Sequence, residues 1–254
     1  MTKKLFFEAI FKFLLGVILI GLLIFLPAGT FNYLNGWIFM GILFIPMFIV
    51  GIIMMIKNPT LLKSRLESKE KQKEQSIVIK LSGLMFIVGF IIAGLDYRYN
   101  WFNLPKIVTY ISIGVFLIAY LLWAEVLREN TYLSRTIKVE ENQKVVDKGL
   151  YSIVRHPMYF ATLLLFLSMP LVLGSLISFF IFLLYPVLII IRIINEEKIL
   201  EKELVGYKEY KQKVKYRLIP WVISDSSIPF PTNLIPSGHL DWATLPLTQE
   251  ATPT

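Results

Sequence analysis

The chain has 254 residues, a formal net charge of +8 and no cysteine. Hydrophobic residues make up 56 % of it and charged residues 17 %, whereas soluble proteins have roughly 45–50 % and about 25 %. The lack of cysteine excludes disulfides, thiolate metal sites and a cysteine nucleophile, and only two histidines, His156 and His239, leave no multi-histidine metal site.

The apolar residues form blocks long enough to cross a membrane, for which a helix needs about 20 apolar residues. Four blocks each predict one crossing, and a fifth is long enough for two: 9–28, 36–56, 79–95, 107–127 and 158–194. Pro170, Gly174 and Ser175 interrupt the fifth block and predict a helical hairpin. The sequence therefore predicts an all-α integral membrane bundle of about five to six transmembrane segments, the last two forming the hairpin.

Lysine and arginine concentrate in a loop over residues 57–80 and in the segment 128–157, whereas the connection 29–35 has neither. The positive-inside rule therefore places both termini in the cytoplasm, with the chain in the cell inner membrane or the endoplasmic reticulum. The basic charge indicates this topology and anionic lipid headgroups as partners, and no nucleic-acid motif is present.

The chain divides into three regions on this basis. Residues 1–128 hold four transmembrane helices, and residues 129–221 hold the chemistry-bearing motifs, the hairpin and a short amphipathic helix predicted by the helical spacing of Leu200, Leu204 and Tyr207. Residues 222–254 are rich in Pro, Ser and Thr, which is typical of a disordered or non-native tail.

Two polar clusters interrupt the apolar C-terminal half. In the first, Arg155-His156-Pro157, a proline suits the first turn of a helix, so His156 is expected at its N-cap, where free backbone N–H groups attract anions. In the second, Arg192 and Glu196 are four residues apart and share a helix face, with Glu197 about 100° further round. Alone, this cluster is typical of an ordinary membrane boundary. The hairpin brings both clusters to one depth, which favours a site.

An ordered set of motifs resembles the isoprenylcysteine carboxyl methyltransferase family, which is related to the phospholipid N-methyltransferases. Residues 130–221 carry most of it, and Asn58-Pro59-x-Leu61-Leu62-x-x-Arg65 is similar to an earlier loop of that family. The matching elements are Gly149-x-Tyr151, Arg155-His156-Pro157-x-Tyr159, Gly174-Ser175, Arg192, Glu196-Glu197, Gly206-x-x-x-Tyr210 and Arg217-Leu218-Ile219-Pro220.

The resemblance implies a methyltransferase that uses S-adenosylmethionine without a Rossmann domain, which agrees with the absence of a G-x-G-x-x-G motif. It implies no metal, and a lipophilic small molecule or prenylated acceptor. Arg192, Glu196 and Glu197 would be catalytic, and Arg192, Tyr207 and Tyr210 would contact the acceptor. The implied cofactor-binding residues are Gln143, Gly149, Leu150, Tyr151, Arg155, His156, Pro157, Tyr159 and Glu196.

Three other functions stay open on the sequence. A phospholipid N-methyltransferase would use an amine acceptor, for which Glu196 or Glu197 is the candidate base. Membrane sterol reductases use NADPH and share a similar Arg-His-Pro region and Tyr-Arg-x-x-Pro ending, but generally have more helices before it. A non-catalytic lipid-binding protein could retain the fold. The motifs do not distinguish a carboxylate, an amine or a thiol as the acceptor, and they do not specify an oligomeric state.

Overall fold

The computed structural model describes residues 3–66, 73–130, 132, 139 and 143–220. These residues form helices and no β-strand, which confirms the predicted all-α fold. The tail predicted over 222–254 lies outside them. The elements are α1 (Lys3–Ala28), α2 (Leu34–Lys57), α3 (Pro59–Leu66), α4 (Lys73–Tyr99), α5 (Lys106–Glu129), the 3₁₀ turn η1 (Gly149–Ser152), α6 (Pro157–Val172), α7 (Leu176–Phe182), α8 (Leu184–Glu203) and α9 (Tyr207–Lys213).

Five helices are long and apolar enough to cross a membrane: α1, α2, α4, α5 and the α7–α8 rod over Leu176–Glu203. The sixth apolar helix, α6, has 16 residues, which correspond to about 24 Å at 1.5 Å per residue. This is shorter than a hydrocarbon core of about 30 Å, so the polar segment before α6 begins within reach of the membrane. The chain is thus a multi-pass membrane bundle.

The predicted hairpin turn is confirmed at Gly174 and Ser175. Gly174 has a φ of 82°, in the left-handed region that glycine adopts without strain. The Ser175 side chain accepts a hydrogen bond from the backbone N–H of Ser178 and so caps α7. Pro170 does not interrupt α6, which continues to Val172, so the turn depends on Gly174 and Ser175.

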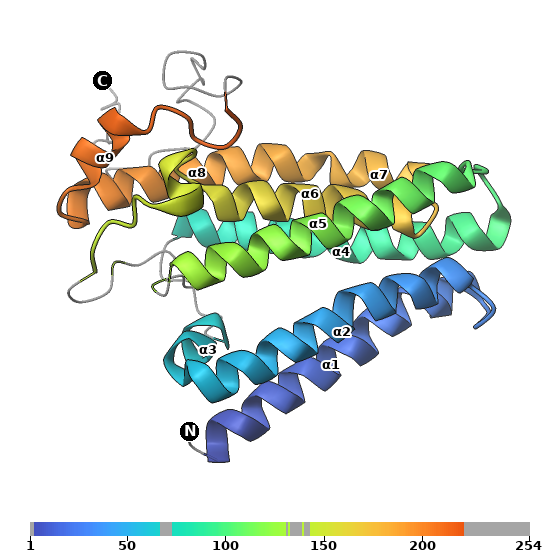
Figure 1. The fold of residues 1–254 in the computed structure, drawn as a ribbon. Helices are drawn as coiled ribbons and strands as arrows, with labels where there is room; N and C mark the ends of the chain where they lie inside the picture. Colours follow the sequence, from blue (N-terminus) through green and yellow to red (C-terminus); the bar gives the residue numbers. More distant parts are fainter. Residues whose placement is uncertain (1–2, 67–72, 131, 133–138, 140–142, 221–254) are drawn as a thin grey trace, which may run out of the picture.

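Figure 1 shows α4, α5, α6 and the α7–α8 rod as one bundle, with α1 and α2 as a pair beside it. In this pair α1 packs on α4 and α2 contacts α5 and α6, and the pair diverges from α5 toward the end of the bundle that carries α3. Glycines permit the close contacts: a Cβ at Gly89 would overlap the Phe182 ring, and one at Gly94 would overlap the Ile24 carbonyl. We call the end that carries α3, η1 and α9 the polar end.

Two local predictions differ from the structure at the polar end. The interval 57–80 is not simply a loop, because α3 lies within it and α4 already begins at Lys73. Leu200, Leu204 and Tyr207 do not share one helix: α8 ends at Glu203, and Gly206, with a φ of 84°, turns the chain into α9. The left-handed glycine ends the helix that the apolar spacing alone would continue.

Candidate functional site

A cavity of about 380 Å³ enters the bundle from the polar end. Its walls come from α4, α6 and α8, and α9 with the segment 143–146 covers its polar side. One part is lined by polar side chains, which include Gln143, Tyr151, His156, Glu196 and Tyr207. The deeper part is lined by Val78, Ile79, Ser82, Gly83, Phe86, Phe166, Tyr185 and Ile189. A single space thus joins a polar compartment to an apolar one.

The start of α6 forms one side of the polar compartment. His156 is the N-cap residue and Pro157 is the first helical residue, as predicted. The backbone N–H groups of Arg155 and His156 donate to the carbonyl oxygens of Tyr216 and Arg217, each at 2.9 Å. The segment after α9 therefore runs along the start of α6 and fixes it.

Glu197 lies in a buried ion cluster behind this wall. It is 3 % exposed, and its Oε1 lies 2.7 Å from Arg155 Nε and 3.2 Å from His156 Nε2. Its Oε2 lies 3.0 Å from Arg217 Nε. Arg155 also donates from Nη1 to the carbonyl oxygen of Val214 at 2.8 Å. Arg155 and Glu197 therefore form an ion pair within the protein. Their opposite charges compensate for the hydration that each side chain loses on burial.

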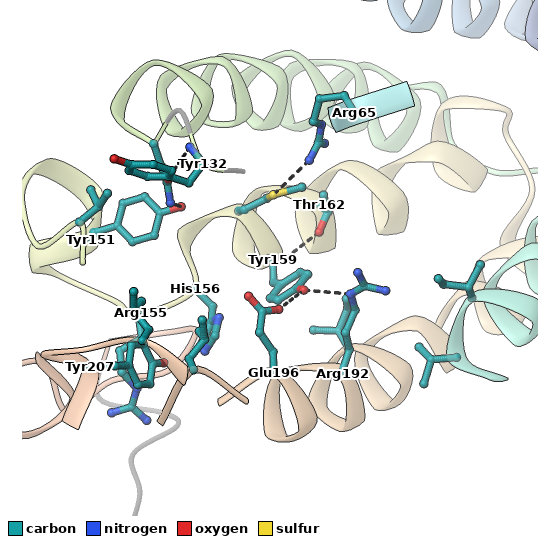
Figure 2. Close-up of a pocket in the computed structure, with 18 of the residues that line it drawn as sticks. Arg65, Tyr132, Tyr151, Arg155, His156, Tyr159, Thr162, Arg192, Glu196 and Tyr207 are labelled. Carbon is teal, nitrogen blue, oxygen red and sulfur yellow. Dashed lines mark hydrogen bonds between the residues drawn. The ribbon is translucent and has the colours of Figure 1, made fainter. Parts of the chain in front are cut away.

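Glu196, one residue earlier, faces the cavity instead. The Tyr159 hydroxyl donates to Glu196 Oε2 and accepts a hydrogen bond from Arg192 Nε at 2.9 Å. Figure 2 shows the three side chains converging across the space between α6 and α8. Arg192 and Glu196 share one face of α8, as their spacing predicts. This triad stands where the polar compartment meets the apolar one.

Three tyrosines surround the far side of the polar compartment. Tyr210 donates from its hydroxyl to the Tyr151 carbonyl oxygen at 2.7 Å, and the Tyr151 hydroxyl accepts from Asn130 Nδ2 at 3.1 Å. The Tyr207 hydroxyl is buried and has no hydrogen-bond partner within the part of the chain that the structure describes. Burial raises the pKa of Tyr207 well above its usual value of about 10, so this hydroxyl stays a donor at neutral pH. An unpartnered buried hydroxyl in a cavity wall is where a bound polar molecule would be held.

The predicted site residues do not all reach this space. Gln143, Tyr151, Arg155, His156, Tyr159, Arg192, Glu196, Tyr207 and Tyr210 line it. Of the described residues that line the cavity, none is Gly149, Leu150, Pro157 or Glu197. Gly149 and Leu150 form the η1 turn, in which the Leu150 N–H donates to the Glu129 carboxylate at 2.9 Å, so they brace the wall from behind.

Sequence reasoning did not find the residues that α3 and α4 contribute. Arg65 lies 3.9 Å from Met158 Sδ and over the Trp123 ring at 5.4 Å, so it reaches the cavity from α3. Arg65 is the last residue of the motif that begins at Asn58, and this motif could have indicated that Arg65 belongs to the site. The residues of α4 that line the cavity are apolar or small and carry no polar signal in the sequence.

Comparison with known proteins gives one positive finding. A family model described as phospholipid methyltransferase matches residues 106–205, which are less than half of the chain. No curated protein matches the chain. The matched part covers α5 to α8 and therefore contains Tyr159, Arg192 and Glu196, but not α9 or Arg217. The similarity indicates a membrane methyltransferase of this general kind.

Proposed function

We propose that the protein is an S-adenosylmethionine-dependent methyltransferase whose acceptor is a lipophilic carboxylate of the isoprenylcysteine type. The observation that carries the proposal is the cavity itself, which joins a polar compartment to an apolar one at the Tyr159–Glu196–Arg192 triad. A water-soluble donor and a lipophilic acceptor must meet at such a boundary. The similarity of residues 106–205 to phospholipid methyltransferases supports methyl transfer as the chemistry.

The side chains that line the polar compartment are suited to binding the cofactor. Tyr207 presents an unpartnered buried hydroxyl there, and Gln143, Tyr151 and Glu196 add further polar groups and an aromatic face. S-adenosylmethionine has a carboxylate, hydroxyl groups and an adenine ring that such side chains can bind, and it supplies an electrophilic methyl group on a sulfonium. His156 lies in the same wall, held by Glu197 behind it.

Arg192 would hold the acceptor. A carboxylate is ionised at neutral pH, since its ordinary pKa is about 4, so it needs no base to become nucleophilic. Its oxygen forms the bond to the methyl carbon as the carbon–sulfur bond breaks, and the products are a neutral ester and a neutral thioether. Guanidinium groups bind carboxylates through two parallel hydrogen bonds. Tyr159 fixes Nε of Arg192, so the orientation of its guanidinium is set before the acceptor binds.

A phospholipid amine is the second candidate acceptor, because the matching family is described as phospholipid methyltransferase. An amine is mostly protonated at neutral pH and must lose a proton before transfer, for which Glu196 is the base within the cavity. Tyr159 already donates to Glu196, however, and Arg192 puts a positive charge beside it. Both features favour an anionic acceptor over a cationic one.

The test is transfer of a labelled methyl group from S-adenosylmethionine by the purified protein in lipid nanodiscs. An S-farnesyl cysteine carboxylate, the same compound as its amide, and phosphatidylethanolamine are compared as acceptors. The proposal predicts labelling of the carboxylate alone, and calorimetric binding of S-adenosylhomocysteine but not NADPH. Labelling of phosphatidylethanolamine alone would establish the second candidate, and binding of NADPH alone would overturn both.

A further inference from the structure

The face of α4 that borders the apolar compartment has its smallest side chains at the middle. Val78 and Ile79 lie one turn before Ser82 and Gly83, and Phe86 lies one turn after them. A Cβ added at Gly83 would meet no atom within 4 Å, unlike one at Gly89 or Gly94 in the same helix. Gly83 is also exposed, although it lines the cavity. It therefore marks an opening, whereas the other two glycines serve helix packing.

The depth of this opening follows from the contact between α4 and α8. The Gln75 side-chain amide lies 3.4 Å from the Arg192 carbonyl oxygen, so these two residues are at one level. Gly83 is two turns of helix further into the bundle, which corresponds to about 12 Å at 1.5 Å per residue. On the opposite wall, Tyr185 lies at a comparable depth, about two turns below Arg192 on α8.

Aromatic rings close the cavity at that depth and just beyond it. The Phe86 and Phe166 rings lie 4.8 Å apart between centroids, and the Phe166 and Tyr185 rings lie 4.7 Å apart, both edge to face. Rings in van der Waals contact leave no path between them for an alkyl chain. These rings therefore block a long chain that starts at Arg192 from continuing along the bundle axis, and Gly83 offers it room sideways.

We propose that the gap at Gly83 is the opening through which the apolar chain of the acceptor passes from the cavity into the bilayer. The proposal rests on the function proposed above. The carboxylate lies at Arg192, the first part of the chain contacts Ile79, Ser82 and Ile189, and the remainder leaves at Gly83 into lipid. Gly83 is thus a specificity-determining residue: it admits chains longer than the apolar compartment can enclose.

Replacement of Gly83 by leucine tests this, with Gly114→Leu as the matched control. Gly114 is a helical glycine of α5 where an added Cβ also meets nothing within 4 Å, and it is not among the described residues that line the cavity. We expect Gly83→Leu to lower kcat/KM at least tenfold for an S-farnesyl cysteine carboxylate and less than twofold for its S-butyl analogue. Gly114→Leu should change neither, and an equal loss for both chain lengths would overturn the opening.

A second measurement does not depend on catalysis. Because the chain has no cysteine, Gly83→Cys and Gly114→Cys each introduce the only thiol. The S-farnesyl carboxylate should slow the reaction of Gly83→Cys with a membrane-permeant maleimide at least fivefold, whereas the S-butyl carboxylate and Gly114→Cys should show no protection. Protection without methyl transfer would retain the chain site and reject the enzyme function. Methyl transfer without protection would retain the enzyme function and reject the opening at Gly83.

Discussion

Glu196 and Glu197 are neighbours in sequence but belong to two regions with different physics. Glu197 contacts the guanidinium groups of Arg155 and Arg217 and the imidazole of His156, and it lies behind the cavity wall. Glu196 faces the cavity, where it accepts a hydrogen bond from Tyr159. The 100° between successive residues of a helix is enough to separate them. We therefore propose a structural role for Glu197 and a ligand contact for Glu196.

The resemblance implied that both glutamates act at the site. In the structure Glu196 lines the cavity, whereas Glu197 lies behind its wall. We propose Glu197 as a positioning residue: it holds His156 and Arg155, which belong to the cavity wall, and it joins them to Arg217 beyond α9. Its effect on a ligand would pass through those side chains.

The largest effect is expected for Glu197→Gln. The substitution leaves the buried Arg155 and the partly buried Arg217 without their carboxylate partner, and breaking a buried ion pair costs about 3–5 kcal/mol. Unfolding in detergent, followed by intrinsic fluorescence, should show a large fall in midpoint. Glu201→Gln is the control, because its partly exposed pair with Lys211 contributes about 0–1 kcal/mol. Normal stability of Glu197→Gln would assign the residue to catalysis instead.

Arg192→Ala should act on the reaction and not on folding. Loss of a charged hydrogen-bond donor to the acceptor costs about 1.5–3 kcal/mol, so kcat/KM should fall about 10–100-fold. Affinity for S-adenosylhomocysteine should stay within twofold by calorimetry. Arg192→Lys should recover only part of the rate, because a lysine lacks the planar fork of the guanidinium. If the alanine variant lost cofactor affinity instead, Arg192 would belong to the cofactor side.

Tyr159→Phe should give a smaller loss of rate. It removes the hydroxyl that orients Arg192, a contribution of about 1 kcal/mol, so kcat should fall about fivefold. Tyr120→Phe, whose hydroxyl donates to the Leu43 carbonyl oxygen at 2.8 Å and which is not among the described residues that line the cavity, is the control and should leave kcat nearly unchanged. If Tyr159 acts through Arg192, its effect should disappear in an Arg192→Lys background.

The smallest effect distinguishes the two tyrosines of α9. Tyr207→Phe removes an unpartnered hydroxyl, so stability should not fall, whereas affinity for S-adenosylhomocysteine should fall about fivefold if that hydroxyl binds it. Tyr210→Phe removes the bond to the Tyr151 carbonyl oxygen and should cost about 1 kcal/mol of stability. Unchanged affinity in Tyr207→Phe would remove Tyr207 from the ligand contacts.

The sequence predicted those features that depend on local chemistry. Runs of apolar residues predicted the crossings, Gly174 and Ser175 the hairpin turn, and Pro157 the start of α6, because each is decided within a few residues. The side on which Glu197 lies could not be predicted, since it depends on Arg217 and on the carbonyl groups of a segment brought back by Gly206. The proposed role of Gly83 could not be predicted either. The sequence does not show whether a glycine in an apolar helix lies at a packed helix contact or at an opening.

The hydrogen bonds from Arg155 and His156 to residues 216 and 217 have a consequence for biogenesis. Helices α1 to α8 can enter the membrane as they leave the ribosome, but the start of α6 gains its backbone partners only when the chain past α9 has been made. A nascent chain halted before Val214 would therefore hold α1 to α8 and the residues that line the cavity, but the start of α6 would lack the backbone partners that fix it. We therefore expect the wall of the candidate site to be fixed last, once the chain has been made past Arg217.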